Sequence, residues 1–397
     1  MVKINTMKKF NKSLVYSEIF PPMHGGSGRW FWEVYSRLDH DKYIVLAGSA
    51  EGDKEFDQNS ALTIERMPFL YKSWSDWGLT SIKGLKFYAK LFIDTLKIVN
   101  KHSIEAIHCG RCIPEGFVAY LIKKIKGTSY YCYIHGEDVE NAATSRSLSW
   151  VVSRALKNAD LLICNSENSK KLLLAHWNVK EANVQVIHPG VDTKKFVPAA
   201  TNLDIRNKLN WHDRPVLLTV SRLEERKGHD MLIRALVDIK QRIPNVLYAI
   251  IGGGPQEELL KSLVAKLKLE ENVLFMSEIS DQAMIECYQQ CDIFVLPNRD
   301  IGRNIEGFGI VMLEAQSCGI PVIGGDSGGT PETIDEGNTG FIVNCDTTAQ
   351  LIGKVEQLLT DKPLRNNMGE NGRIWAHQFD WEEQSIKLDA LFKKFDS

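Results

Sequence analysis

The apolar positions of this chain fall into short continuous runs that are separated by longer amphipathic stretches. Such runs are typical of strands buried on both faces of a sheet, and the stretches between them are typical of helices. In the first half we predict strands at Ser13–Phe20, Tyr43–Ala47, Ala106–His108, Tyr130–His135, Leu161–Asn165 and Val184–His188. In the second half we predict them at Pro215–Ser221, Val246–Ile251, Val273–Met276, Ile293–Leu296, Pro321–Gly324 and Gly340–Val343. Alternating strands and helices predict parallel sheets of the α/β class.

The strand pattern stops after the first half and starts again near Arg214. Residues 198–213 between the halves are polar and rich in Asn, which predicts a linker. We therefore predict two Rossmann-like domains over residues 1–198 and 199–375. A C-terminal segment, 376–397, contains an amphipathic helix predicted from about Trp381 to Phe395.

Length, charge and composition limit the function classes. A chain of 397 residues is long enough for two domains. The formal net charge of −2 argues against general nucleic-acid binding, which favours a basic surface. We expect a cytoplasmic protein with reduced thiols, because the eight cysteines are scattered and mostly lie in apolar runs, and the basic N-terminal stretch lacks an apolar core.

A glycine-rich loop follows the first predicted strand. Pro21-Pro22 ends the strand, Gly25-Gly26-Ser27-Gly28 follows, and a helical pattern begins near Trp30. This order is the opening of a Rossmann unit, and Gly26 could bring a backbone N–H close to a phosphate. The fingerprint of a dinucleotide-binding dehydrogenase would need a third glycine where Phe31 stands, so the sequence does not match that fingerprint.

Two motifs in the second half combine charge with strand or helix ends. Arg222 and Lys227 follow a predicted strand and suit a diphosphate, although a solvated basic loop is an equal alternative. Glu306 and Glu314 flank Gly309, where a helix starts and offers free N–H groups to a phosphate. Glu314 interrupts an apolar helix face and therefore needs partners, either ribose hydroxyls or a structural salt bridge.

Three further features are weaker when each is taken alone. Glycine clusters at 252–254 and 324–329 follow strands, and such clusters are often only turns. His135 ends a predicted strand, where it could orient hydroxyls or handle protons, but a loop histidine with satisfied hydrogen bonds is the more common case.

The ordered set of these motifs resembles glycosyltransferase family 4, whose members are retaining enzymes of the GT-B fold. The matching pieces are Pro21-Pro22, Gly25-Gly26, His135-Gly136, His188-Pro189-Gly190-Val191-Asp192, Ser221-Arg222-Leu223, Lys227-Gly228, the Glu306 and Glu314 pair, and Gly328-Gly329-Thr330-Pro331-Glu332. The stretch from Glu306 to Glu332 looks closest to bacterial phosphatidylinositol-mannoside mannosyltransferases. The GT-B resemblance implies two Rossmann-like domains that face a central cleft, with the last helix crossing back to the first domain.

The resemblance also implies a nucleotide-sugar donor and a role for each matching residue. The catalytic set would be His135, Arg222, Lys227 and Glu306. The donor-binding set would be Gly26, Arg222, Lys227, Gly253, Ile279, Glu306, Phe308, Gly309, Ile310, Val311 and Glu314. Arg222 and Lys227 would hold the diphosphate, Glu306 the transferred sugar and Glu314 the ribose, while the backbone near Ile279 would pair with the base.

No metal or other cofactor is expected. Cations aimed at a diphosphate stabilise the charge that develops as the bond from C1 to oxygen breaks. The only Asp-x-Asp, Asp39-His40-Asp41, lies at a predicted helix end, and we interpret it as surface. Cys109 and Cys112 lack a second ligand cluster that would complete a zinc site, and we interpret them as small buried thiols.

The sequence says less about the acceptor and about contact with a membrane. The acceptor is a glycan or a lipid-linked hydroxyl, and the donor is GDP-mannose or a UDP-hexose. The aromatic and Lys-rich segment Phe69–Phe92, with Trp74 and Trp77, suits a peripheral membrane contact at the inner face, although an ordinary amphipathic helix explains it too. A sugar-nucleotide epimerase or phosphorylase on the same fold and a non-catalytic sugar-nucleotide binder are the alternative functions.

Overall fold

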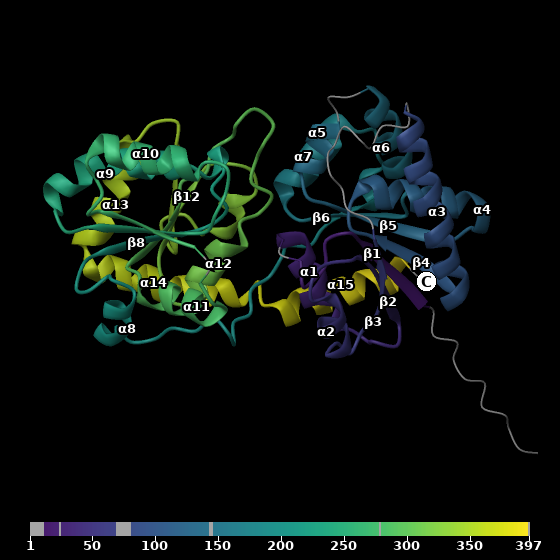
Figure 1. Ribbon diagram of the computed structural model, residues 1–397, viewed down its shortest axis with the longest axis horizontal. Coiled ribbons are helices and arrows are strands. Elements are labelled where there is room, and N and C mark those ends of the chain that lie inside the picture. The colour runs from purple at the N-terminus through teal and green to yellow at the C-terminus, as the bar shows by residue number, and fades with distance from the viewer. Residues whose placement is uncertain (1–11, 24, 69–80, 143–145, 278, 396–397) are drawn as a thin grey trace, which may run out of the picture. The chain divides into compact units, whose positions relative to one another are not determined.

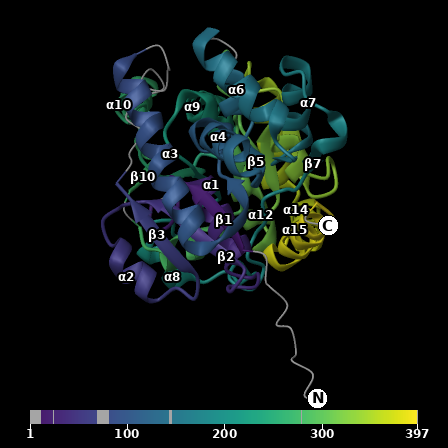
Figure 2. The ribbon, with the colours of Figure 1, turned by 90° about the vertical axis from the view of Figure 1, so that its right-hand side faces the viewer.

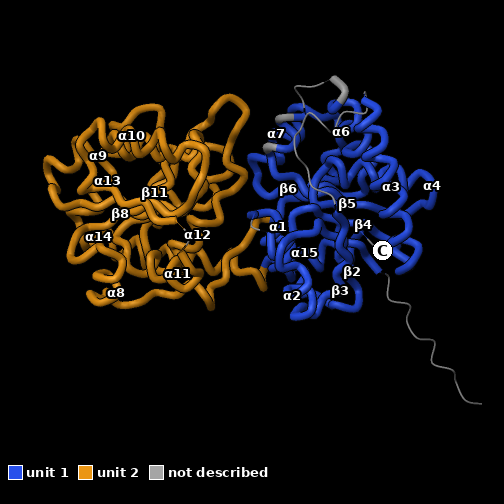
Figure 3. The backbone as a smooth tube through the Cα atoms, viewed as in Figure 1, with its two compact units in different colours: residues 1–187, 384–397 blue, residues 188–383 orange. Residues whose placement is uncertain are grey.

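The chain folds into two compact units, each with its own parallel sheet. The computed structural model describes residues 12–23, 25–68, 81–142, 146–277 and 279–395. The first unit comprises residues 1–187 and 384–397, and the second comprises residues 188–383 (Figure 3). The predicted α/β class with two Rossmann-like domains is confirmed (Figure 1).

The first unit is built on a seven-stranded sheet in the order β3-β2-β1-β4-β5-β6-β7. Every neighbouring pair is parallel. The strands are β1 (Lys12–Ser17), β2 (Tyr43–Gly48), β3 (Thr63–Met67), β4 (Ile104–Cys109), β5 (Ser129–Ile134), β6 (Leu161–Cys164) and β7 (Val184–Val186). The chain reverses its direction of travel across the sheet between β1 and β4, which is the position where such folds bind ligands.

Helices cover both faces of this sheet. They are α1 (Gly26–Tyr35), α2 (Asp53–Gln58), α3 (Ile82–His102), α4 (Phe117–Lys126), α5 (Glu137–Ala142), α6 (Arg146–Asn158), α7 (Glu167–His176) and α15 (Trp381–Phe395). Helices α3 and α4 lie next to each other and share a core with α6 and α7 (Figure 2). On the opposite face, Phe392 of α15 stacks on Tyr35 of α1, and its ring centroid lies 4.3 Å from that of His108.

The second unit repeats the same strand order with six strands, β10-β9-β8-β11-β12-β13, all parallel. The strands are β8 (Val216–Val220), β9 (Leu247–Ile251), β10 (Val273–Met276), β11 (Ile293–Leu296), β12 (Val322–Gly325) and β13 (Gly340–Val343). Most of their residues are buried, as expected for strands covered on both faces.

Two helical layers enclose this second sheet. Helices α9 (His229–Arg242), α10 (Glu257–Leu267) and α13 (Ala349–Thr360) share one core. Helices α11 (Asp281–Gln290), α12 (Ile310–Ser317) and α14 (Lys362–His377) pack on the other face, near the short helix α8 (Leu203–Lys208). Helix α12 directly precedes β12, which positions its N-terminus at the carboxyl edge of the sheet.

Residues 198–213, predicted to be a linker, instead belong to the second unit. Trp211 is fully buried there, and the buried Arg206 donates to the carbonyl oxygen of His212 at 2.7 Å. The polar composition misled the prediction because Arg206, although charged, is buried and donates its hydrogen bonds to backbone carbonyl oxygens. Strand β3 was not predicted either, since Glu65 and Arg66 interrupt its apolar pattern at the sheet edge.

Candidate active site

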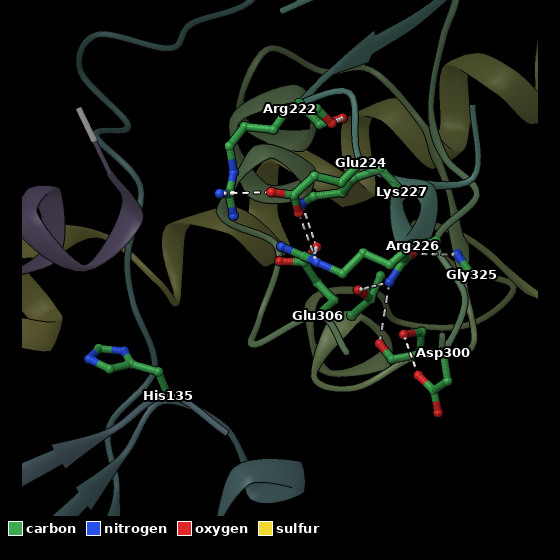
Figure 4. Close-up of polar contacts among 12 residues, drawn as sticks. His135, Arg222, Glu224, Arg226, Lys227, Asp300, Glu306 and Gly325 are labelled. Carbon is green, nitrogen blue, oxygen red and sulfur yellow. Dashed lines mark hydrogen bonds and ion pairs between the residues drawn. The ribbon is translucent and has the colours of Figure 1, made fainter. Parts of the chain in front are cut away.

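Charged residues gather at the carboxyl end of β8, in the second unit. The turn from β8 to α9 supplies four of them, and the loop before α12 supplies the fifth. We call this group the charged cluster, which consists of Arg222, Glu224, Arg226, Lys227 and Glu306 (Figure 4). Its place matches the edge at which open α/β sheets bind ligands.

The cluster is a chain of ion pairs that runs from the surface inward. Arg222 has a side chain that is 68% exposed, and its Nη1 lies 2.8 Å from Glu224. The other oxygen of Glu224 accepts from Nε of Arg226 at 3.1 Å. Arg226 Nη1 then reaches Glu306 Oε2 at 2.7 Å, and Lys227 Nζ contacts the same oxygen. The structure therefore joins the predicted residues Arg222, Lys227 and Glu306 in one network.

The electrostatics of the cluster follow from its burial. Burial alone would raise the pKa of Glu306, but Lys227 and Arg226 outweigh it and lower this pKa to about 2. Burial lowers the pKa of Lys227, and the charge of Glu306 opposes that shift. A carboxylate with two cationic partners stays ionised throughout the neutral range.

The glycine cluster at 324–329 supports the backbone of Glu306. Gly329 donates its N–H to the Glu306 carbonyl at 2.9 Å. Gly328 has φ +56°, and a Cβ there would lie 1.9 Å from the same carbonyl oxygen, so a side chain would push Glu306 away. Beyond this turn, Glu332 lies 2.9 Å from Nε2 of His188, which brings two of the family-like segments together.

Helix α12 presents its first backbone N–H groups beside this loop. Gly309 is its N-cap residue, with φ +93°, and Phe308 before it is buried. Ile310 and Val311 form the first turn, where N–H groups lack partners within the helix. Glu314 lies on the same helix, and its Oε2 accepts a hydrogen bond of 2.7 Å from the Tyr288 hydroxyl of α11. The buried Glu314 thus already has a protein hydrogen-bond donor.

The loops after β9 and β10 supply the remaining predicted donor-binding residues. Gly253 is exposed, and its carbonyl accepts the Leu223 N–H at 2.9 Å, which fixes the loop against the segment that contains Arg222. Ile279 is half-buried and packs against the core of the second unit.

His135 and Gly26 belong to the first unit. Nε2 of His135 lies 2.9 Å from the Gly110 carbonyl, which can only accept, so this nitrogen donates and Nδ1 is left as an acceptor. The His135 backbone N–H donates to Asp138 at 3.1 Å. Burial lowers the pKa of His135, so the ring is neutral at pH 7. Gly26 is exposed in the first turn of α1.

The structure adds Arg226, Glu224 and Tyr288 to the residues found from sequence. In the run Glu224-Glu225-Arg226-Lys227 charges of both signs stand side by side, as on a solvated loop, and nothing in the sequence distinguishes Arg226 from its neighbours. The sequence offers no local signal for its partnership with Glu306, because the two residues lie 80 positions apart in the chain. Tyr288 gave no signal, because a tyrosine on an apolar helix face is ordinary core.

Metal sites and membrane spans are absent from the part of the chain that the structure describes. Within the described ranges, no group of three or more His, Cys, Asp or Glu side chains is placed to hold a metal ion. In the same part of the chain, no helix has both the length and the apolar character needed to cross a bilayer. Cys109 and Cys112 are buried, and burial raises the pKa of each thiol.

Two protein families match the chain, one for each half. The family described as Glycosyltransferase Family 4 matches residues 24–195, and the one described as Glycosyl transferases group 1 matches residues 202–375. The matches have the order expected from the motifs.

Curated relatives match over the full length. The GDP-mannose-dependent alpha-(1-6)-phosphatidylinositol monomannoside mannosyltransferase of Mycolicibacterium smegmatis is 32% identical over 95% of this chain and 97% of that protein. The protein of the same description from Mycobacterium tuberculosis is 30% identical over 98% of this chain and 99% of that protein.

Solved structures share the fold. Anabaena Alr3699/HepE in complex with UDP-glucose has a TM-score of 0.80 at 20% identity, covering 96% of this chain and 99% of that one. Sucrose-phosphate synthase from Thermosynechococcus elongatus has a TM-score of 0.79 at 21% identity, covering 97% and 99%. Both are similar to this chain in architecture.

Proposed function

This chain belongs to glycosyltransferase family 4 and is a hexosyltransferase, and we propose that it moves mannose from GDP-mannose to a hydroxyl of an inositol-containing glycolipid. The donor and acceptor are taken from the relatives that match it over its full length at about 30% identity. The UDP-glucose bound to a neighbour of the same fold makes a UDP-hexose the competing donor.

One observation supports this proposal above the others, namely the charged cluster at the carboxyl end of β8. It contains three cations and two carboxylates, so it has a net positive charge to offer a diphosphate. The exposed Arg222 can exchange its ion pair with Glu224 for a bidentate contact with phosphate oxygens. The N-terminus of α12 adds backbone N–H groups and a positive dipole end.

We propose the following division of roles. Arg222 and Lys227 stabilise the charge that collects on the departing nucleoside diphosphate, and the N–H groups of Ile310 and Val311 assist them. Glu306 accepts hydrogen bonds from hydroxyls of the mannose, and Glu314 accepts them from hydroxyls of the ribose. In the first unit, Gly26 provides a backbone N–H for the phosphates, and His135 provides a neutral imidazole near the sugar. Gly253, Ile279, Phe308 and Gly309 line the donor site.

Retention of configuration and independence from metals belong to the proposal as well. Cationic side chains supply the positive charge that a metal would otherwise give to the diphosphate. We expect the rate of transfer to be unchanged by excess EDTA. The one-bond coupling between C1 and H1 of the product mannose, measured by NMR, should show the configuration of the donor; an inverted product would contradict the proposal.

The test of donor and acceptor is an assay of the purified protein with a phosphatidylinositol mannoside in detergent. We expect mannose transfer from GDP-mannose and little transfer from UDP-glucose. Lys227→Met should abolish transfer, whereas Lys261→Met, the same change at an exposed residue of α10, should not. Conversion of the sugar nucleotide without acceptor would instead indicate an epimerase.

We further propose that the first unit contacts the inner face of the membrane through α3. Its exposed row contains Ile82, Leu85 and Ile93, with 74%, 54% and 51% exposure, beside several lysines. Apolar side chains bordered by Lys favour an anionic lipid surface. Trp74 and Trp77, which first suggested this contact, lie outside the described residues.

Liposome co-sedimentation tests the membrane contact. A triple change of Ile82, Leu85 and Ile93 to Ser should reduce binding to vesicles that contain anionic phospholipid. The matched control, Leu259→Ser, alters an apolar residue that is 64% exposed in the second unit and should have no effect. Equal binding of wild type and triple variant would remove this part of the proposal.

A further inference from the structure

Arg226 is the most buried cation of the charged cluster, and it is placed differently from the other two. Its side chain is 6% exposed, against 68% for Arg222 and 10% for Lys227. Two of its nitrogens are committed to two different carboxylates, Nε to Glu224 at 3.1 Å and Nη1 to Glu306 at 2.7 Å. A planar guanidinium held at two points cannot rotate toward a ligand without losing one of them.

The backbone of Arg226 is fixed as well. Its carbonyl accepts the N–H of Arg299 at 2.9 Å. The Arg299 side chain is itself held by Asp230, through two hydrogen bonds of 2.8 Å and 3.1 Å. Hydrogen bonds to its main chain and to its side chain therefore hold Arg226 in one position.

Lys227 shares the same Glu306 oxygen but has more freedom. An ammonium group has three donors on a flexible stem, so it can turn one of them to a phosphate. Under the proposed function a diphosphate of negative charge competes with Glu306 for this ammonium. If Lys227 were the only partner of Glu306, donor binding would loosen the carboxylate at the moment when it has to receive the sugar.

We infer that Arg226 is a positioning residue, which holds the Glu306 carboxylate in place through a bond that persists while Lys227 turns toward the donor diphosphate. Arg226 acts through Glu306 and does not itself touch the donor. This inference rests on the proposed function, since it needs Glu306 to face the transferred sugar and Lys227 to face the phosphates.

The test is a double-mutant cycle on transfer with Arg226→Met and Glu306→Gln. On the wild-type background we expect Arg226→Met to lower kcat/KM by about tenfold or more, because Glu306 then depends on Lys227 alone. On the Glu306→Gln background the same change should alter kcat/KM by less than about threefold. Equal factors on the two backgrounds would overturn the inference.

Two further readouts separate positioning from a general structural role. The affinity for GDP, measured by calorimetry, should stay within about threefold of wild type in Arg226→Met, whereas Lys227→Met should lose most of it. The acid limb of the kcat/KM profile should move to higher pH in Arg226→Met, since Glu306 loses a cation, and should not depend on residue 226 when Glu306 is Gln. A loss of GDP affinity in Arg226→Met as large as in Lys227→Met would make Arg226 a phosphate ligand and refute the inference.

Separate controls cover a variant that fails to fold and a failure of the proposed function. If Arg226→Met does not fold, Arg226→Lys keeps the charge but removes the fork, and it should follow the same cycle with a smaller drop. Wild-type protein that binds GDP but transfers no mannose contradicts the proposed function. Wild-type transfer together with independent effects of the two substitutions contradicts only the role of Arg226.

Discussion

Replacing Glu306 by Gln should destabilise the second unit, and the structure gives the size of the effect. The pKa of Glu306 is about 2, against 4.5 for an unperturbed carboxyl. At about 1.36 kcal/mol per pKa unit, this difference corresponds to roughly 3 kcal/mol in favour of the ionised carboxylate. Glu306 is only 9% exposed, so solvent screens little of that energy. Glutamine would leave Arg226 and Lys227 buried beside a neutral amide.

We therefore expect Glu306→Gln to lower the free energy of unfolding by about 3 kcal/mol at pH 7, and the melting temperature of a domain of this size by roughly 6–12 °C. Because folding depresses the pKa of Glu306, its contribution is complete above pH 4.5 and is lost as pH falls toward 2. The difference between variant and wild type should shrink over that range.

Differential scanning calorimetry at pH 7 and again near pH 3 measures both expectations. Glu382→Gln is the matched control, since Glu382 is an exposed partner of Lys194 and its loss should leave the midpoint unchanged. A Glu306→Gln midpoint within about 1 °C of wild type at pH 7 would refute the argument. So would a difference that stays constant on acidification.

Three other outcomes follow from the same geometry. Glu314→Gln should weaken GDP-mannose binding by about 10- to 100-fold in calorimetry, because a charged acceptor for the ribose hydroxyls is lost; unchanged affinity would argue against that role. Gly228→Ala should lower the melting temperature, because φ is +72° and the new Cβ would lie 1.7 Å from the Pro297 carbonyl oxygen, whereas Gly353→Ala, whose Cβ meets nothing within 4 Å, should be neutral or stabilising. The lowered pKa of His135 keeps its ring neutral above pH 6.5, so kcat/KM should show no ionisation of this residue between pH 6.5 and 8; a limb there that disappears in His135→Asn would contradict the assignment.

Strand positions could be predicted from the sequence because buried parallel strands are nearly continuous apolar runs. The bounds predicted for Val273–Met276 and Ile293–Leu296 agree with β10 and β11. The same rule fails at the sheet edge, where β3 includes Glu65 and Arg66. Polarity also misled the prediction for residues 198–213, since burial of Trp211 depends on tertiary contacts that no local pattern records.

The candidate site could be predicted only in part. Glycines at strand ends and charges beside them made Arg222, Lys227 and Glu306 candidates, since a diphosphate suits cations near backbone N–H groups. The roles predicted for them came from the family resemblance. The partnership of Arg226 with Glu306 depends on where side chains point from a single 3₁₀ turn, which spacing along the sequence does not determine.

A crystal structure of the protein soaked with GDP tests the central claim most directly. We predict density for the diphosphate against Arg222 and Lys227, with the ribose hydroxyls toward Glu314. The contradicting result is a diphosphate that contacts neither Arg222 nor Lys227, for example one bound against Arg234 and Lys266 in the cavity between α9 and α10, which shares only Glu224 with the charged cluster.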